Sequence, residues 1–102
     1  MKNKKEVGQL LEAIVADYAS WCRDDRSISE FKAELSVCEG NKYLKVMSKS
    51  SVWGFVLLKD DAKFKEGDIL KAASYNAPAR NKARGNILEG GYNIQWTGPR
   101  YL

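Results

Sequence analysis

The sequence has no histidine and only two cysteines, and both shortages limit its chemistry. Histidine is the commonest general base and metal ligand in proteins, so the usual Ser-His and Cys-His nucleophile systems are ruled out. Cys22 and Cys38 lie in different predicted elements without CxxC spacing, which favours two ordinary small apolar residues over a disulfide framework. We therefore expect a protein that is not an enzyme and that holds no cofactor and no metal.

Long apolar runs are also missing. No stretch approaches the ~18 apolar residues of a membrane span, and Glu6, Glu12 and Asp17 interrupt the segment behind the basic N-terminus, which argues against a signal peptide. The 102 residues, 44% of them hydrophobic, suffice for one domain, residues 1–102, with a single core. We expect a cytoplasmic protein that does not contact a membrane.

Acidic residues are scarce in the last third of the chain. Residues 1–68 hold 12 Lys/Arg and 12 Asp/Glu, whereas residues 69–102 hold five Lys/Arg and Glu89 as their one acid. The whole net charge of +4 therefore comes from the last third.

Apolar residues recur at spacings of three and four from Val7 to Cys22. This period predicts an amphipathic helix over about residues 4–24, the most strongly patterned element of the chain. Tyr18 and Trp21 fall on its apolar stripe, so we expect both rings to pack in the core.

The segment that follows the helix fits two structures. Ser27 and Glu30 have capping-box spacing, which indicates a short helix. Apolar residues alternate with polar or small ones from Phe31 to Val37, however, which is the period of a half-buried strand. We favour the strand, because Gly40 and Asn41 then supply a hairpin turn to a second strand at 43–48. The pattern alone leaves open whether residues 28–38 are helix or strand.

Residues 51–58 are rich in β-branched and aromatic side chains and predict a central strand, with Gly54 indicating a bulge or a close backbone approach. Strict alternation puts Trp53 and Phe55 on one face and Val52 on the other. Near the C-terminus, residues 92–96 predict a short strand and residues 98–99 a turn.

One helix followed by strands predicts an α+β fold, with one long N-terminal helix packed on a mostly antiparallel sheet of four or five strands. A sheet this small leaves an edge strand unpaired, so self-association through that edge is also expected.

The stretch NAPARNKARGN, residues 76–86, carries three cations and no acid. On a solvated loop, its arginines would fork onto phosphate or carboxylate oxygens, and Gly85 would allow a turn that brings N–H groups forward. The expected nucleic-acid or anion-binding residues are Lys71, Arg80, Lys82, Arg84 and Arg100. Nearby rings that would stack on bases or bind a partner are Tyr75, Trp96 and Tyr101. The alternative is a merely solvated loop without function.

The stretches KFKEGDILKAASYNAPARNKARGNIL and WTGPRYL resemble a set of small uncharacterised accessory proteins of tailed bacteriophages, over about residues 43–102. The resemblance implies a small accessory role in the cytoplasm of a bacterial host, and it brings no known activity with it.

Two functions follow as hypotheses. The first is an accessory module that binds a polyanion, with nucleic acid favoured, through the basic C-terminal third. The second is a protein-interaction module that binds and modulates a larger bacterial host protein, with Trp96, Arg100 and Tyr101 as anchors, because Trp, Tyr and Arg dominate interface energies.

Overall fold

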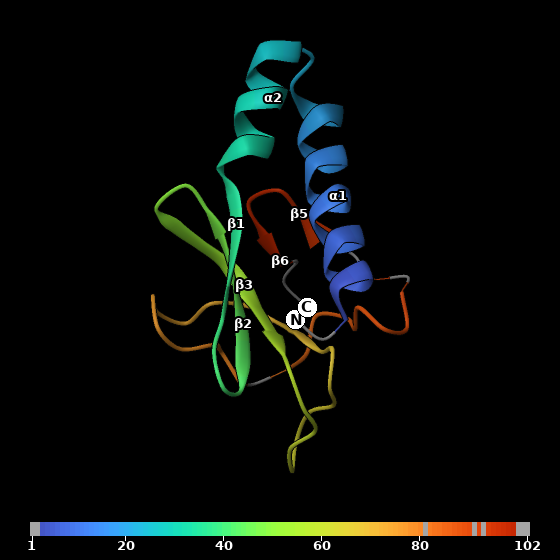
Figure 1. Cartoon of the computed structure of the whole chain (residues 1–102), viewed down its shortest axis with the longest axis vertical. Helices are drawn as coiled ribbons and strands as arrows, with labels where there is room; N and C mark the ends of the chain where they lie inside the picture. Colours follow the sequence, from blue (N-terminus) through green and yellow to red (C-terminus); the bar gives the residue numbers. More distant parts are fainter. Residues whose placement is uncertain (1–2, 81, 91, 93, 100–102) are drawn as a thin grey trace.

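Two helices pack on a four-stranded antiparallel sheet in the computed structural model, which describes residues 3–80, 82–90, 92 and 94–99 (Figure 1). The helices are α1 (Lys4–Trp21) and α2 (Asp25–Glu34), and the sheet has the order β1-β2-β3-β4. Its strands are β1 (Leu35–Glu39), β2 (Tyr43–Ser48), β3 (Ser51–Leu57) and β4 (Ile69–Leu70). A separate hairpin joins β5 (Ile94–Gln95) to β6 (Gly98–Pro99). The predicted α+β fold and the central position of β3 are confirmed.

Helix α1 follows its predicted stripe but ends three residues earlier than expected. Val7, Leu10 and Ile14 are buried against the sheet, as the spacing indicates. Trp21 lies in the last turn and is 69% exposed, so the prediction that its ring is buried in the core was wrong. No helix in the described ranges has both the length and the apolar character needed to cross a membrane.

Helix α2 replaces the first part of the strand that we predicted. The Asp24 side chain accepts a hydrogen bond from the Ser27 N–H at 3.2 Å, so Asp24 rather than Ser27 caps the helix. Phe31 is buried and stacks on Tyr18 with ring centroids 4.2 Å apart. The cap and this ring contact outweigh the alternating pattern, and the strand begins only at Leu35. The predicted hairpin is confirmed, since β1 pairs with β2 in antiparallel register.

A bulge in β3 sends neighbouring aromatic residues to opposite faces of the sheet. Val46 pairs with Gly54 and Met47 pairs with Val52, which leaves Trp53 as the extra residue. A bulge of this kind shifts the alternation by one residue. Trp53 therefore packs in the core beneath the helices, whereas Phe55 packs on the other face, and the prediction that they share a face was wrong.

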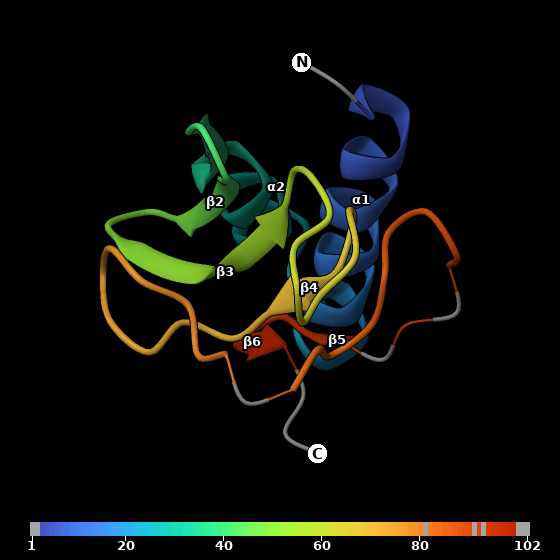
Figure 2. The ribbon, with the colours of Figure 1, turned by 90° about the horizontal axis from the view of Figure 1, so that it is seen from below.

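The face of the sheet away from the helices has a smaller core of its own. Phe55, Leu57, Phe64 and Leu70 form this second cluster. Phe64 comes from the mostly polar connection between β3 and β4, residues 58–68. In Figure 2 the orange segment after β4 runs along β3 on the side away from α1. Irregular segments thus cover the face that the helices leave open.

The C-terminal hairpin differs in detail from the prediction. Of the described residues in the expected strand over 92–96, Ile94 and Gln95 form β5, and Gly98 and Pro99 form strand β6 instead of a turn. The turn lies at Trp96 and Thr97. The Trp53 indole N–H donates to the Gln95 carbonyl at 2.8 Å, which fastens this hairpin to β3.

Gly85 sits where a side chain has no room. Its φ is +142°, and an added Cβ would lie 2.4 Å from the Cβ of Tyr92. We predict that Gly85→Ala lowers the free energy of unfolding by about 2 kcal/mol or more, measured by urea denaturation. In the matched variant Gly8→Ala the new methyl group meets open space inside α1, and stability should rise by about 1 kcal/mol. Equal stability of the Gly85→Ala variant and the wild type would show that Tyr92 is free to move aside.

Candidate anion-binding site

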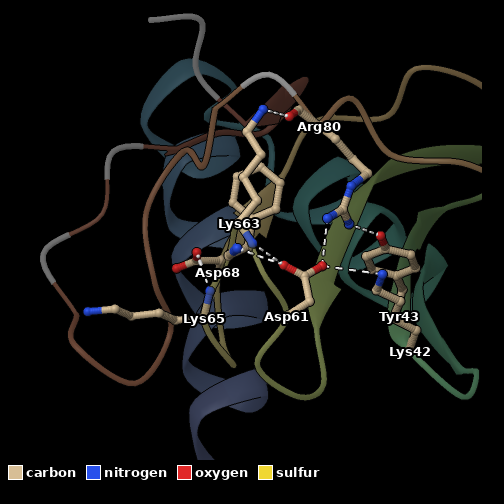
Figure 3. Close-up of polar contacts among 8 residues, drawn as sticks. Lys42, Tyr43, Asp61, Lys63, Lys65, Asp68 and Arg80 are labelled. Carbon is tan, nitrogen blue, oxygen red and sulfur yellow. Dashed lines mark hydrogen bonds and ion pairs between the residues drawn. The ribbon is translucent and has the colours of Figure 1, made fainter.

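Asp61 is the centre of a cluster of basic side chains from three parts of the chain (Figure 3). Its Oδ2 atom lies 2.6 Å from Arg80 Nη2 and 3.2 Å from Lys42 Nζ. Arg80 also donates through Nη1 to the Tyr43 hydroxyl, and Lys63 Nζ donates to the Arg80 carbonyl oxygen. We call these five residues the Asp61 cluster. It joins the β1–β2 turn to the loop after β3 and to the segment after β4.

The other oxygen of the Asp61 carboxylate orders its own loop. Oδ1 accepts hydrogen bonds from the backbone N–H groups of Phe64, at 2.7 Å, and Lys63, at 2.8 Å. The Phe64 bond, followed by the contact with Arg80, holds the pKa of Asp61 well below its usual range, so the carboxylate is charged at neutral pH. The hydrogen bond to Asp61 in turn raises the pKa of the Arg80 guanidinium above its ordinary value.

A cleft of about 270 Å³ lies beside the Asp61 cluster, and we call it the basic cleft. Its walls combine aromatic rings, two lysines and two asparagine side chains, with no acidic residue: Cys38, Gly40, Asn41, Lys42, Tyr43, Lys45, Phe55 and Asn76. Lys45 Nζ lies 3.2 Å from Asn76 Oδ1 and 4.1 Å from the ring centroid of Tyr75, which is 57% exposed. The cleft therefore presents cationic and aromatic groups together at the surface.

The predicted contact residues Arg80 and Arg84 are both engaged with the protein. Arg80 keeps 36% of its side chain exposed while it pairs with Asp61. Arg84 is only 7% exposed, and its Nε donates to the Lys82 carbonyl at 3.1 Å. Its backbone N–H and the Gly85 carbonyl both pair with Ile69. The prediction of a freely solvated arginine loop was wrong for Arg84, because this backbone pairing draws the segment against β4.

The remaining predicted residues that the structure describes do not gather at one place. Lys71, directly after β4, is half-buried, and Lys82 is exposed. Trp96 packs on the helix side of the sheet, where its ring centroid lies 5.1 Å from that of Tyr18, 5.3 Å from Trp21 and 6.0 Å from Phe31. Arg100 and Tyr101 lie outside the described residues. Trp96 and Arg80 are thus on opposite faces of the sheet and do not form one site.

Sequence reasoning missed Lys42, Tyr43, Lys45, Asp61 and Lys63. Asp61 forms a common turn motif, in which an Asp side chain accepts hydrogen bonds from the backbone N–H groups two and three residues further on. That motif is too frequent to identify a site. Only the fold brings Asp61 to Arg80, which is 19 residues away in the chain. Among the described residues, no group of three or more His, Cys, Asp or Glu side chains is arranged to hold a metal ion.

Residues 2–101 match the model of a family of unknown function, DUF7717, and the chain belongs to this family. No curated protein and no solved structure matches the chain at a significant level. The function must therefore be argued from the geometry itself.

The lowered pKa of Asp61 leads to a prediction about acid stability. A carboxylate with a depressed pKa stabilises the fold above its unfolded pKa of about 3.9, and this stabilisation is lost as the pH falls toward the folded pKa. Asp61→Asn should therefore lower the melting temperature at pH 7, by about 5 °C or more. The difference from the wild type should shrink below about pH 4. Circular-dichroism melts between about pH 2 and pH 8 test this.

The matched control is Asp25→Asn, on an exposed position in the first turn of α2. Its melting temperature should follow the wild type closely across the same pH range. Parallel curves for Asp61→Asn and wild type, with no convergence in acid, would contradict a structural role for the Asp61 carboxylate.

Proposed function

We propose that this chain is a small cytoplasmic module that binds a polyanion, a nucleic-acid backbone in the first place, across the basic cleft. The observation that carries the proposal is the lining of the cleft, which has two lysines and no acid. The neighbouring Asp61 carboxylate is shared between Lys42 and Arg80, and Lys63 adds a further exposed charge. The surface is therefore positive even though Asp61 lies within it.

The aromatic groups favour single-stranded nucleic acid over a small anion. Proteins hold single strands by stacking bases on exposed rings beside cationic groups that contact phosphates. Tyr75 offers such a ring next to Lys45, and Tyr43 and Phe55 form walls of the cleft. In this arrangement the ammonium groups of Lys42 and Lys45 contact the phosphates of the nucleic-acid backbone. Arg80 has a different role from the one first expected, because it positions the cleft through Tyr43 instead of reaching a phosphate itself.

A charge-matched pair of double variants tests this function. Lys42→Ala with Lys45→Ala removes two cations from the basic cleft, whereas Arg23→Ala with Arg26→Ala removes two from the opposite end of the molecule, near the start of α2 (Figure 1). Each lost phosphate contact reduces the slope of log K against log salt by about 0.7 for single strands, so the cleft variant should lose about 1.4. The control variant should retain the wild-type slope. Fluorescence anisotropy with a labelled oligonucleotide at several salt concentrations measures both.

Two results would overturn the assignment. One is the absence of binding by the wild type at low salt. The other is an equal loss of affinity in both double variants, which would indicate attraction by net charge alone. Tyr75→Ala separates stacking from charge, since it should weaken single-stranded binding while leaving binding to duplex DNA nearly unchanged.

A protein partner is the second candidate, and the exposed ring of Trp21 favours it. Trp21 and the half-buried Trp96 border an open groove of about 510 Å³ between the helices and the β2–β3 turn. Exposed tryptophans at grooves are frequent anchors of interfaces. The anchor would then be Trp21 together with Trp96, on the opposite face from the basic cleft.

Trp21→Ala tests the second candidate. Its large exposure predicts a change in melting temperature of only about 2 °C or less, because surface substitutions seldom affect stability much. A partner retained by the wild-type protein from nuclease-treated lysate should be lost with Trp21→Ala and retained with the Lys42→Ala, Lys45→Ala double variant. A partner lost with the cleft variant instead would assign the interaction to the basic cleft.

A further inference from the structure

Strand β1 is an outer strand of the sheet, with one edge unpaired in the order β1-β2-β3-β4. The Lys49 N–H donates to the Glu34 carbonyl, and the Gly40 N–H donates to the Tyr43 carbonyl, both at 2.9 Å. Hydrogen-bonded pairs alternate along an antiparallel ladder, so the even-numbered residues of this strand bond to β2. The backbone N–H and C=O groups of Leu35, Val37 and Glu39 therefore point away from β2.

An apolar groove runs beside this open edge. It has a volume of about 410 Å³ and lies between α1 and the junction of α2 with β1. Leu11, Val15 and Leu35 supply apolar walls and are only half-buried. The groove residues are Gly8, Leu11, Glu12, Val15, Ala16, Lys32 and Leu35. A strand that paired with β1 would thus satisfy backbone groups and cover apolar surface in one contact.

We propose that the occupant is a second copy of this chain, whose β1 pairs antiparallel with β1 so that Val37 faces Val37 across a two-fold axis. This register uses all five residues of the strand, and it directs the outward backbone groups of both copies at one another. It sets Leu35 opposite Glu39 of the second copy. A register centred on Glu39 would instead place two carboxylates side by side.

Charge complementarity supports the Val37 register over an unrelated peptide. Directly paired residues project to the same face, so Glu39 of the second copy emerges beside Leu35, next to the groove that Lys32 lines. Lys32 and Glu39 are both exposed, and neither forms an ion pair with another described residue. The two-fold axis repeats the Lys32–Glu39 pair at the other end of the strands. The edge is therefore complementary to itself.

The joined sheet keeps both pairs of helices on one side. A two-fold axis perpendicular to the sheet leaves each copy's α1 on the same face, with one apolar groove on each side of the seam. The basic cleft lies on the other face, where Lys45 and Phe55 project. The two copies together would present two basic clefts on one side, each bordering the seam at Cys38.

Charge reversal with light scattering tests the interface. Lys32→Glu and Glu39→Lys should each weaken the dimer by about tenfold or more, because each change acts twice across the two-fold axis. The double variant should return to within about threefold of the wild type, since the pair is restored with its signs exchanged. Circular dichroism confirms that each variant is folded. A wild-type protein that stays monomeric up to about 0.5 mM, or a dimer that neither single change weakens, would overturn the proposal.

Cross-linking tests the register independently. Val37 pairing sets Ser36 opposite Cys38 of the second copy at a non-hydrogen-bonded position, where Cα atoms are about 4.5 Å apart and a disulfide is geometrically allowed. In a Cys22→Ser background, Ser36→Cys should give a covalent dimer on mild oxidation, and the background alone should give little. A covalent dimer of equal yield in the background protein would place Cys38 against Cys38 and refute this register.

Discussion

The ionised carboxylate of Asp61 is the interaction on which the second face of the molecule depends. The helices cover only one face of the sheet, so the other core is closed by irregular chain. Such chain has no regular hydrogen-bond ladder to fix it, and local polar contacts must do so instead. Asp61 binds two backbone N–H groups of its own loop with one oxygen and the side chains of Arg80 and Lys42 with the other. One side chain thus orders three separate segments over Phe55 and Phe64.

The same arrangement determines what the basic residues can do. A guanidinium that holds a loop in place is a poor first contact for a ligand, because ligand and carboxylate compete for the same donors. Around it, Lys63 is exposed, Lys42 keeps 44% of its side chain exposed, and the half-buried Lys45 bonds to the neutral Asn76 side chain instead of a carboxylate. The arginines that dominate the sequence pattern therefore stabilise and position the site, and the lysines on neighbouring elements provide the accessible charge.

The sequence predicted the structure correctly where one hydrophobic period runs uninterrupted. It predicted the structure poorly where two patterns fit the same segment. The stripe from Val7 to Ile14 and the β1–β2 hairpin follow directly from spacing and turn residues. The segment from Asp25 to Glu34 has both the alternation of a strand and the cap of a helix. The contact of Phe31 with Tyr18, which is 13 residues away, favours the helix. The bulge at Trp53 likewise depends on how β2 and β3 align, which no local pattern contains.

The candidate site was less predictable than the fold for the same physical reason. Net charge directed attention to the segment around Arg80, but the burial of Arg84 and the pairing of Arg80 with Asp61 depend on contacts between segments far apart in the chain. A cleft between Lys42 and Lys45 becomes visible only when Asn76 folds back onto β2.

Helix α2 ends at Glu34 and strand β1 begins at the next residue, without a linker between them. A junction of this kind has no loop residues to absorb a change of direction, so the orientation of the strand is coupled to that of the helix. Phe31, near one side of that junction, belongs to the aromatic group around Tyr18 and Trp96, and the open strand edge begins on the other side. A change in the direction of β1 would therefore also require a change in the direction of α2, and with it in the packing of Phe31 on Tyr18.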